Sequence, residues 1–571
     1  MKILTFLYYF FLLTYATSAK TPPNFPSNIP LRIGTYKNWG NDLIVPNIWF
    51  ATPSNDRDVV TIANWAHANN FKLRASGFMH NWAPMTVTNT NKYDKNIILV
   101  DTTEAFTKMQ IISSPYADTS AVRVGSGVTL HDLLSFLEEN GLGVYSAPAI
   151  GKVTIGGILA IGGHGSSVLA KGEKTPPGFS YGTMSNLVIS LTAVVWSPQE
   201  NSYVLKTFNR TDPDTKAFLV NLGRTFITEV TLMVGPNYNL RCESRADILS
   251  DELFADPENV RQSSRTFSRF LDETGRIETI LFPFTNTPWL KKWSIIEKRP
   301  DSLFSRKVNS PYNYYLTNIF SEQMSMIVGN ITNNFGILNP ILGPAESLLS
   351  SIANFALLSF DIWGPSKNLL LYVKDTTFRQ TECSFVVITK RSNVQNIVSR
   401  ATAFYNKLLL DYSAAKKFPI NGVMEIRASA LDYPYGVVPD GDSPPLSPLQ
   451  PIEGRPELNT GVWISILSFK NAKYQNEALQ KVERFFLDTI DDGVNAVVRP
   501  EWSKGYGYTN EAPWTNTNVL RKIPSKFPDS STYDGWNFTA STFAKYDPHW
   551  IFSNDYLDEL FGNVSKSKLK S

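Results

Sequence analysis

Hydrophobic and polar positions follow two different periods along the first part of the chain. Residues 48–53, 72–77 and 96–101 have the short apolar runs of buried strands, whereas residues 55–70 have helical spacing with Asp56 in the opening turn. A strand at residues 122–126 then precedes an amphipathic helix that ends before Gly141. The apolar face of that helix is formed by Leu130, Leu133, Leu134 and Leu137. With further strands at residues 187–196 and 225–234, the chain begins as an α+β domain.

The pattern changes after about residue 240. A polar helix is predicted over residues 257–275, followed by apolar and aromatic strands at residues 276–284, 369–375 and 384–390. These elements favour an antiparallel sheet covered by helices. We therefore expect a second domain over residues 241–492 and a final segment, residues 493–571, that returns to the first domain. The proline-rich residues 440–456 are predicted to form an exposed loop within the second domain.

The length, net charge and cysteines of the chain restrict what kind of protein it can be. The chain has 571 residues, which is beyond the size at which one core keeps growing, so two domains are expected. Its formal net charge is +3 and its basic residues are scattered, which excludes a nucleic-acid partner. Cys242 and Cys383 are the two cysteines; a disulfide between them stays open, and a structural metal site is not expected.

The N-terminus predicts export. Residues 1–19 combine a lysine, an apolar run and a small-residue ending, which is the pattern of a cleaved signal peptide. We expect a secreted protein, extracellular or periplasmic. Four sequons agree with a eukaryotic secretory route, at Asn209, Asn330, Asn537 and Asn563.

Small residues gather at two places in the first domain. Ser76 and Gly77 end a predicted strand, where successive backbone N–H groups can converge on an anion. A second glycine cluster covers residues 151–165. Residues 124–128 contain two glycines but not the third glycine of a dinucleotide fingerprint, so an NAD-type Rossmann site is not expected.

Three side chains stand out chemically. His80, one of five histidines, lies in the loop after Gly77. Glu425 and Arg427 are two residues apart on a predicted strand, so both point to the same face between apolar neighbours. Burying such charges is costly unless they pair or take part in chemistry, and a surface ion pair is the alternative interpretation.

The order of these features resembles the vanillyl-alcohol-oxidase-type (PCMH) family of FAD-linked oxidases, and within it the sterol oxidases that hold FAD covalently. The resemblance rests on the loop around His80, "GGHGSS" at residues 162–167, "MEIR" at residues 424–427 and "RPEWSKG" at residues 499–505. It implies a two-subdomain FAD-binding domain over residues 20–240 and an inserted substrate-binding, or cap, domain over residues 241–492.

The resemblance also implies roles for individual residues. His80 would be joined covalently to FAD, and no cysteine near His164 offers a second attachment. Glu425 would accept the hydroxyl proton of the substrate, and Arg427 would stabilise charge on oxygen. Lys504 would lie at the flavin ring. Glu278 alternates with Ile280 and Phe282 on one strand face, so we expect it to face the same cavity and form a gate with Arg427, a solvated strand end being the alternative. The other expected cofactor contacts are Ser76, Gly77, Asn81, Trp82, Thr154, Gly157, Gly163, His164, Gly165 and Ile227.

The second domain suggests the substrate. Its candidate lining, residues 281–294, 311–320 and 336–360, is largely apolar and offers few polar groups to a sugar, although an ordinary core explains many of these residues equally well. We expect a sterol whose 3-hydroxyl is oxidised by hydride transfer to flavin N5, with O2 reduced to H2O2. Residues 337–360 are candidates to cover the entrance and touch a membrane surface. The alternatives are a polyol or aldonolactone oxidase or dehydrogenase, and an inactive sterol- or lipid-binding protein.

Overall fold

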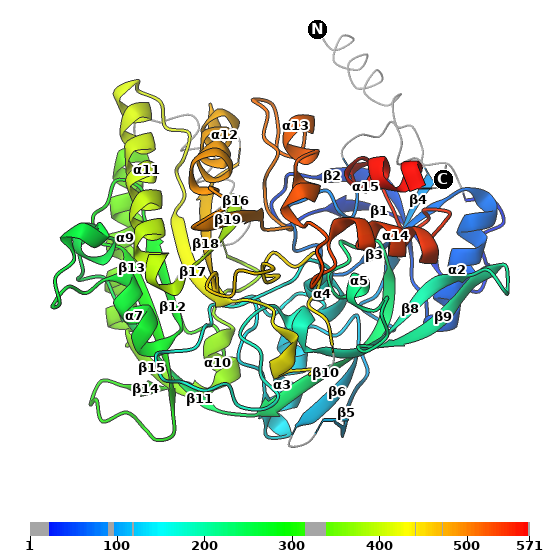
Figure 1. The fold of residues 1–571 in the computed structure, drawn as a ribbon, viewed down its shortest axis with the longest axis horizontal. Coiled ribbons are helices and arrows are strands. Elements are labelled where there is room, and N and C mark those ends of the chain that lie inside the picture. Colours follow the sequence, from blue (N-terminus) through cyan, green and yellow to red (C-terminus); the bar gives the residue numbers. More distant parts are fainter. Residues whose placement is uncertain are drawn as a thin grey trace, which may run out of the picture.

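A computed structural model describes residues 22–88, 96–116, 119–314, 339–377, 379–439, 441–470 and 472–568 (Figure 1). The predicted signal peptide and the sequon at Asn330 lie outside the described residues.

The N-terminal part forms two small sheets. The first has the order β1-β2-β4-β3, and α2 (Asp56–Asn69) connects β2 to β3, which lie on either side of β4, as the helical spacing predicts. Asn55 caps this helix by accepting a hydrogen bond from the Asp58 amide. The strands of this sheet are β1 (Leu31–Lys37), β2 (Ile44–Ala51), β3 (Lys72–Ser76) and β4 (Ile97–Asp101).

The second sheet has the order β5-β6-β10-β8-β9, with β7 paired to β10. Its strands are β5 (Met109–Ser113), β6 (Ser120–Gly125), β7 (Leu142–Gly143), β8 (Val188–Ser197), β9 (Ser202–Asn209) and β10 (Phe226–Pro236). The predicted apolar face of α3 (Leu130–Glu139) is buried. The short α4 (Ile155–Ala160) follows within the glycine cluster.

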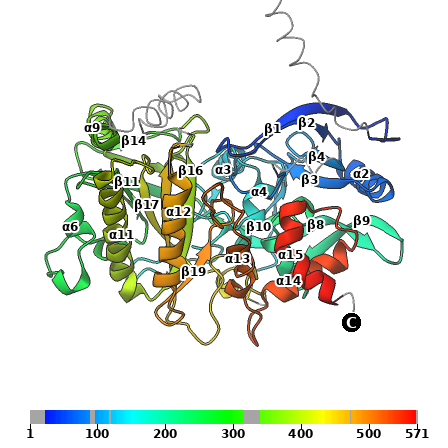
Figure 2. The ribbon, with the colours of Figure 1, turned by 90° about the horizontal axis from the view of Figure 1, so that it is seen from above.

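A nine-stranded sheet, in the order β14-β15-β11-β13-β12-β17-β18-β16-β19, dominates the rest of the molecule. All its pairs are antiparallel except β14 with β15. Its strands are β11 (Asn239–Arg245), β12 (Ile277–Leu281), β13 (Trp289–Ile296), β14 (Arg306–Lys307), β15 (Asp361–Pro365), β16 (Thr381–Thr389), β17 (Met424–Ala430), β18 (Thr460–Ser468) and β19 (Ala496–Pro500). Two helices, α11 (Val394–Ala414) and α12 (Gln475–Arg484), lie side by side against it (Figure 2). The α+β class and the helix-covered antiparallel sheet are confirmed.

The chain ends beside its beginning. α14 (Trp536–Tyr546) packs against β8 and against α5 (Lys216–Leu219), and α15 (Asp555–Lys568) packs on α14 (Figure 1). A buried ion pair of 3.1 Å between Arg224 and Asp547 holds these parts together. β19, by contrast, belongs to the nine-stranded sheet. The domain limits at residues 240 and 492 stay predictions.

Two predicted elements are wrong. The polar helix over residues 257–275 is reduced to α7 (Phe267–Thr274), because Thr266 caps a helix that starts only there. Residues 369–375 are not a strand: α10 (Ser366–Leu370) runs into a loop in which the amides of Tyr372 and Val373 both donate to the Ala149 carbonyl.

The proline-rich residues 440–456 are not an exposed loop either. Leu446 and Leu449 among the prolines are fully buried, and Leu449 packs in one cluster with Val386 and Trp463 of the nine-stranded sheet. The Leu446 carbonyl accepts a hydrogen bond from the Trp502 indole. The apolar residues between the prolines therefore turn this segment into a cover for the sheet.

The cysteines do not form a disulfide. Cys242 lies on β11 and Cys383 on β16, and both thiols are buried and unbonded to one another. Four strands separate β11 from β16 in the sheet, so the thiols are too far apart to be bridged.

Candidate active site

A cavity of about 480 Å³ lies where the two small sheets meet the nine-stranded sheet. Its walls come from the loop after β3, from the glycine cluster, from the loop before β10, and from β12, β13 and β17. Most of the predicted site residues line it: Ser76, Gly77, His80, Asn81, Trp82, Thr154, Gly157, Gly163, His164, Ile227, Glu425, Arg427 and Lys504.

The loop that carries His80 is held on both sides. The Asn81 side chain accepts a hydrogen bond from the Tyr36 hydroxyl, and the amides of Trp82 and Ala83 both donate to the Ser503 carbonyl. The imidazole packs 4.7 Å from the Trp39 ring, between centroids. Burial, together with the nearby charges of Lys504 and Arg379, holds the pKa of His80 well below its usual value. The ring is therefore neutral, and a nitrogen lone pair is available as a nucleophile.

The glycine cluster forms a close-fitting cradle beside this loop. Thr154 caps α4 by accepting a hydrogen bond of 3.2 Å from the Gly157 amide. A Cβ atom on Gly77 would lie 2.7 Å from the Thr154 side chain, and one on Gly163 would lie 2.6 Å from Ile158. Glycine at these positions keeps open a slot between two stretches of backbone whose amide groups can approach a ligand.

Glu425 and Arg427 face the cavity from β17, as the strand period predicts. The Arg427 Nε lies 3.5 Å from the Glu425 carboxylate. Burial and the neighbouring Glu278 raise the pKa of Glu425 well above its usual value, although Arg427 opposes the shift. Burial lowers the pKa of Arg427, but the surrounding carboxylates, Glu425 first, outweigh it and raise that pKa. The pair therefore combines a permanent cation with a strong proton acceptor.

Glu278 does not line the large cavity. It lies on β12 directly opposite Arg427, is 1% exposed, and pairs with Lys291 at 2.6 Å. The Tyr372 hydroxyl donates to its other oxygen at 2.8 Å. Lys291 and Tyr372 were not among the predicted residues; Tyr372 was missed because its segment reads as a strand.

Lys504 lies at the side of the cavity that holds His80. Its ammonium group is 3.5 Å from the centroid of the Trp82 ring and 2.5 Å from a Glu382 oxygen. The other Glu382 oxygen is buried and has no hydrogen-bond partner among the described residues. Next to His80 there is therefore a fixed cation, Lys504, and beside it a Glu382 oxygen that can still accept a hydrogen bond.

His164 has a packing role and an electrostatic one. Its ring is stacked at 3.7 Å on Trp463 of β18, with an angle of 5° between the planes. The Nε2 atom lies 3.8 Å from Glu501, a residue of the "RPEWSKG" motif that the sequence did not single out. Burial lowers the pKa of His164, and Glu501 only partly opposes the shift.

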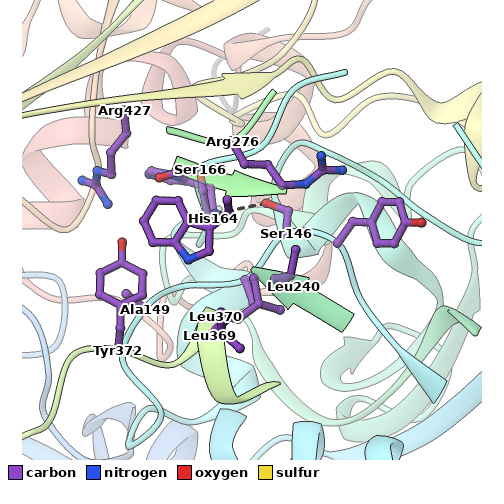
Figure 3. A pocket seen from close by; sticks show the side chains of 14 residues that line it. Ser146, Ala149, His164, Ser166, Leu240, Arg276, Leu369, Leu370, Tyr372 and Arg427 are labelled. Atoms are coloured by element: carbon purple, nitrogen blue, oxygen red, sulfur yellow. Dashed lines mark hydrogen bonds between the residues drawn. The ribbon is translucent and has the colours of Figure 1, made fainter. Parts of the chain in front are cut away.

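A second cavity, of about 30 Å³, lies behind Arg427 (Figure 3). The guanidinium of Arg427 and the hydroxyl of Tyr372 point toward one another there, and both side chains line both cavities. Gly165, predicted as a cofactor contact, lines the smaller cavity, where its amide hydrogen-bonds Ser146. Arg427 and Tyr372 thus form part of the wall between the two spaces.

The part of the large cavity beyond Glu425 is mainly apolar, although Lys291 and Glu346 also line the cavity. Ile280 of β12 lies directly opposite Glu425, and Phe282, Trp289, Val423 and Leu467 continue the lining. A bulky apolar ligand with one polar end fits this gradient from charged to apolar walls.

Comparison with known proteins identifies the family. A family profile described as "FAD binding domain" matches residues 49–196, and one described as "Cholesterol oxidase, substrate-binding" matches residues 239–562, more than half of the chain. The chain belongs to the cholesterol oxidase family. The expected vanillyl-alcohol-oxidase-type FAD-binding domain with a substrate-binding domain is thereby confirmed. The cradle kept open by Gly77 and Gly163 is consistent with an FAD site.

Solved structures of cholesterol oxidases agree over the whole chain. A solvent-stable cholesterol oxidase is 40% identical, with a TM-score of 0.90 over 95% of this chain and 99% of that one. The cholesterol oxidase from Brevibacterium sterolicum is 34% identical, with the same TM-score and the same coverage.

Curated sequences give a more distant and partial likeness. D-arabinono-1,4-lactone oxidase from Saccharomyces cerevisiae is 26% identical over 219 residues, which are 38% of this chain and 37% of that protein. The matched region thus spans little more than a third of the length of such relatives.

Proposed function

We propose that this protein is an FAD-dependent cholesterol oxidase that converts the 3-hydroxyl of a sterol to a ketone and reduces O2 to H2O2. One observation carries the proposal: a single cavity joins the glycine cradle and His80 to the partly buried Glu425–Arg427 pair and to an apolar slot. The membership in the cholesterol oxidase family supports the same substrate. The likeness to lactone oxidases covers too little of the chain to favour a sugar lactone.

Glu425 and Arg427 perform the proton chemistry. FAD, when bound, would supply a two-electron acceptor for the hydride of the alcohol carbon, with O2 as the final acceptor of both electrons. Glu425 in its ionised form accepts the hydroxyl proton, since its raised pKa makes the carboxylate a strong base. Arg427, whose Nε makes no hydrogen bond within the described part of the chain, holds Glu425 and stabilises negative charge developing on the substrate oxygen.

The other side of the cavity holds the cofactor. His80 is proposed to bind FAD covalently through its neutral imidazole, and Lys504 to stabilise negative charge on the reduced cofactor. The wall formed by Arg427 and Tyr372, with Glu278 hydrogen-bonded behind it, is the proposed gate between the two cavities.

Peroxide release tests the proposed substrate. The purified protein is expected to produce H2O2 with cholesterol in detergent and none above background with xylitol or an aldono-1,4-lactone. The apolar slot offers a sugar few polar partners, and its buried polar groups would remain unpaired. Comparable peroxide release with xylitol or the lactone would instead support the alternative substrates.

A membrane surface is the proposed source of the sterol. α9 (Asn339–Ala356) has large apolar side chains on one outer face, and its one charged residue, Glu346, lines the cavity instead. That face consists of Ile341, Leu348, Leu349 and Ile352, each more than half exposed. Exposed Leu303 and Phe304 continue the patch through contact of Phe304 with Phe360. Among the described residues no helix has the length and apolar character to cross a bilayer, so α9 is proposed to lie on the surface.

Replacing Leu348, Leu349 and Ile352 together with serine is therefore expected to lower sterol oxidation from lipid vesicles by about ten-fold or more, since each buried apolar group strengthens interfacial binding. Oxidation of detergent-dispersed sterol should stay unchanged, and vesicle co-sedimentation should fall in parallel. A matched triple variant on the exposed side of another helix, α11, replacing Leu410, Lys407 and Asp411, serves as control. Equal losses with vesicles and detergent would contradict the membrane role.

Export is proposed from the N-terminal pattern. The acceptor asparagines Asn209 and Asn537 are both exposed, as glycosylation in a secretory route requires.

A further inference from the structure

Lys291 is a buried cation beside the active-site carboxylates and has no part in the reaction proposed above. It lies on β13 and is 3% exposed. The strand register places it directly opposite Glu278, and Glu278 directly opposite Arg427. A lysine, a carboxylate and an arginine therefore form one row across three neighbouring strands.

The surroundings fix the ammonium group of Lys291 in place. It lies 4.3 Å from the ring centroid of Trp289, 4.7 Å from that of Tyr372 and 5.1 Å from that of Tyr314. Three aromatic faces stabilise a desolvated cation. Its hydrogen bond to Glu278 is 2.6 Å long, and the Tyr372 hydroxyl binds the second Glu278 oxygen. Both oxygens of this carboxylate are thus satisfied, which favours its ionised form.

The carboxyl groups of Glu278 and Glu425 interact directly. The two carboxyl groups are hydrogen-bonded to one another, which lowers the pKa of Glu278 and raises that of Glu425. Burial raises the pKa of Glu278, but the charge and hydrogen bond of Lys291, the contact with Glu425 and the charge of Arg427 together outweigh it. Lys291 is the largest of these opposing influences, so the proton is expected to reside on Glu425.

The balance of charges around Glu425 points the same way. Three other carboxylates face it: Glu278 on β12, Glu382 on β16 and Glu501 after β19. Arg427 on β17 and Tyr372 in the loop after α10 face it as well. Lys291 on β13 pairs with Glu278, Lys504 pairs with Glu382, and His164 lies beside Glu501. With His164 neutral, the site holds four carboxyl groups, Glu425 included, and three cations, which are Arg427, Lys291 and Lys504. Since a buried site does not tolerate excess charge, one carboxyl group keeps its proton near neutral pH.

We propose that Lys291 is a positioning residue for the oxidation: by fixing the negative charge on Glu278, it keeps the shared proton on Glu425 and makes ionised Glu425 a stronger acceptor for the hydroxyl proton of the substrate. The inference rests on the proposed function, because Glu425 acts as proton acceptor there. Without the lysine, Glu278 takes the proton, and Glu425 is ionised at lower pH but is a weaker base.

The pH dependence of flavin reduction tests this role. Anaerobic stopped-flow mixing with cholesterol in detergent gives the rate for the wild type and for Lys291→Met, Lys291→Arg and Lys291→Met/Glu278→Gln. The wild-type rate should rise with pH through the raised pKa of Glu425. In Lys291→Met that rise should move to lower pH by about one unit, with a lower plateau. Lys291→Arg, which keeps the cation, should retain the wild-type profile.

The double variant protects the test against misfolding, because it leaves no unpaired charge between the strands. The pH profile of its flavin-reduction rate should also move to lower pH. The flavin absorbance of each variant shows whether its active site is intact. A uniform loss of rate at every pH, with the midpoint unmoved in both Lys291→Met and the double variant, would overturn the proposal and leave Lys291 a packing role. A wild type that no sterol reduces would instead refute the proposed function itself.

Discussion

Glu425→Gln is expected to slow flavin reduction by cholesterol by about 10²- to 10⁴-fold, the range that a positioned general base contributes. Glutamine preserves the shape of the side chain beside Arg427 but cannot accept the hydroxyl proton. Glu425 is partly buried, faces the cavity and lies 3.5 Å from Arg427, so no other described carboxylate has the same position. Sterol binding should change little, because the apolar slot beyond Glu425 is untouched. Anaerobic stopped-flow measurement of the rate at saturating sterol checks the result.

Glu477→Gln provides the matched control. Glu477 lies on α12 on the outside of the nine-stranded sheet, where it pairs with Lys481 at 3.1 Å. The control variant should reduce its flavin at the wild-type rate. If Glu425→Gln did the same, the proton would go to another group and the role of Glu425 would have to be abandoned.

His80→Ala is expected to abolish covalent retention of the flavin. Acid precipitation of the wild type should leave the flavin on the peptide that contains His80, whereas the variant should release all of it to the supernatant. The reason is that His80 presents a neutral, partly buried imidazole at the wall of the cavity, and hydrogen bonds hold the loop on both sides of it. Peptide mass spectrometry locates the modification.

His131→Ala is the control for this experiment. His131 lies on α3 with a side chain that is 41% exposed, and it does not line the large cavity, so its loss should leave the flavin attached. Flavin that stayed on the protein after loss of His80 would assign the linkage to a different residue. Flavin released from the wild type would show that the cofactor is held without a covalent bond.

Features set by local sequence could be predicted well. The helical spacing of α2, the apolar face and the end of α3, the glycine cradle and the common face of Glu425 and Arg427 each depend on spacings of a few residues. Periods of 3.6 and 2 residues carry that information directly. The resemblance to a flavin family added the roles, because a histidine or a Glu-x-Arg pattern alone has several interpretations.

Features set by strand pairing could not be predicted. Lys291 meets Glu278 only because β12 and β13 pair in one register, and Lys504 meets Glu382 across 122 residues of sequence. Tyr372 reaches Glu278 from a segment whose apolar run is typical of a strand but whose amides bind Ala149 instead. The same limit applies to residues 440–456. The prolines there are typical of an exposed loop, but Leu446 and Leu449 between them are buried.

Anaerobic mixing of the purified protein with cholesterol tests the central claim most directly. The account predicts that the oxidised flavin spectrum is bleached by one equivalent of sterol, and that admission of air restores it with release of one equivalent of H2O2. An oxidised spectrum that stays unchanged with excess cholesterol, in protein that carries its full complement of FAD, would contradict the account.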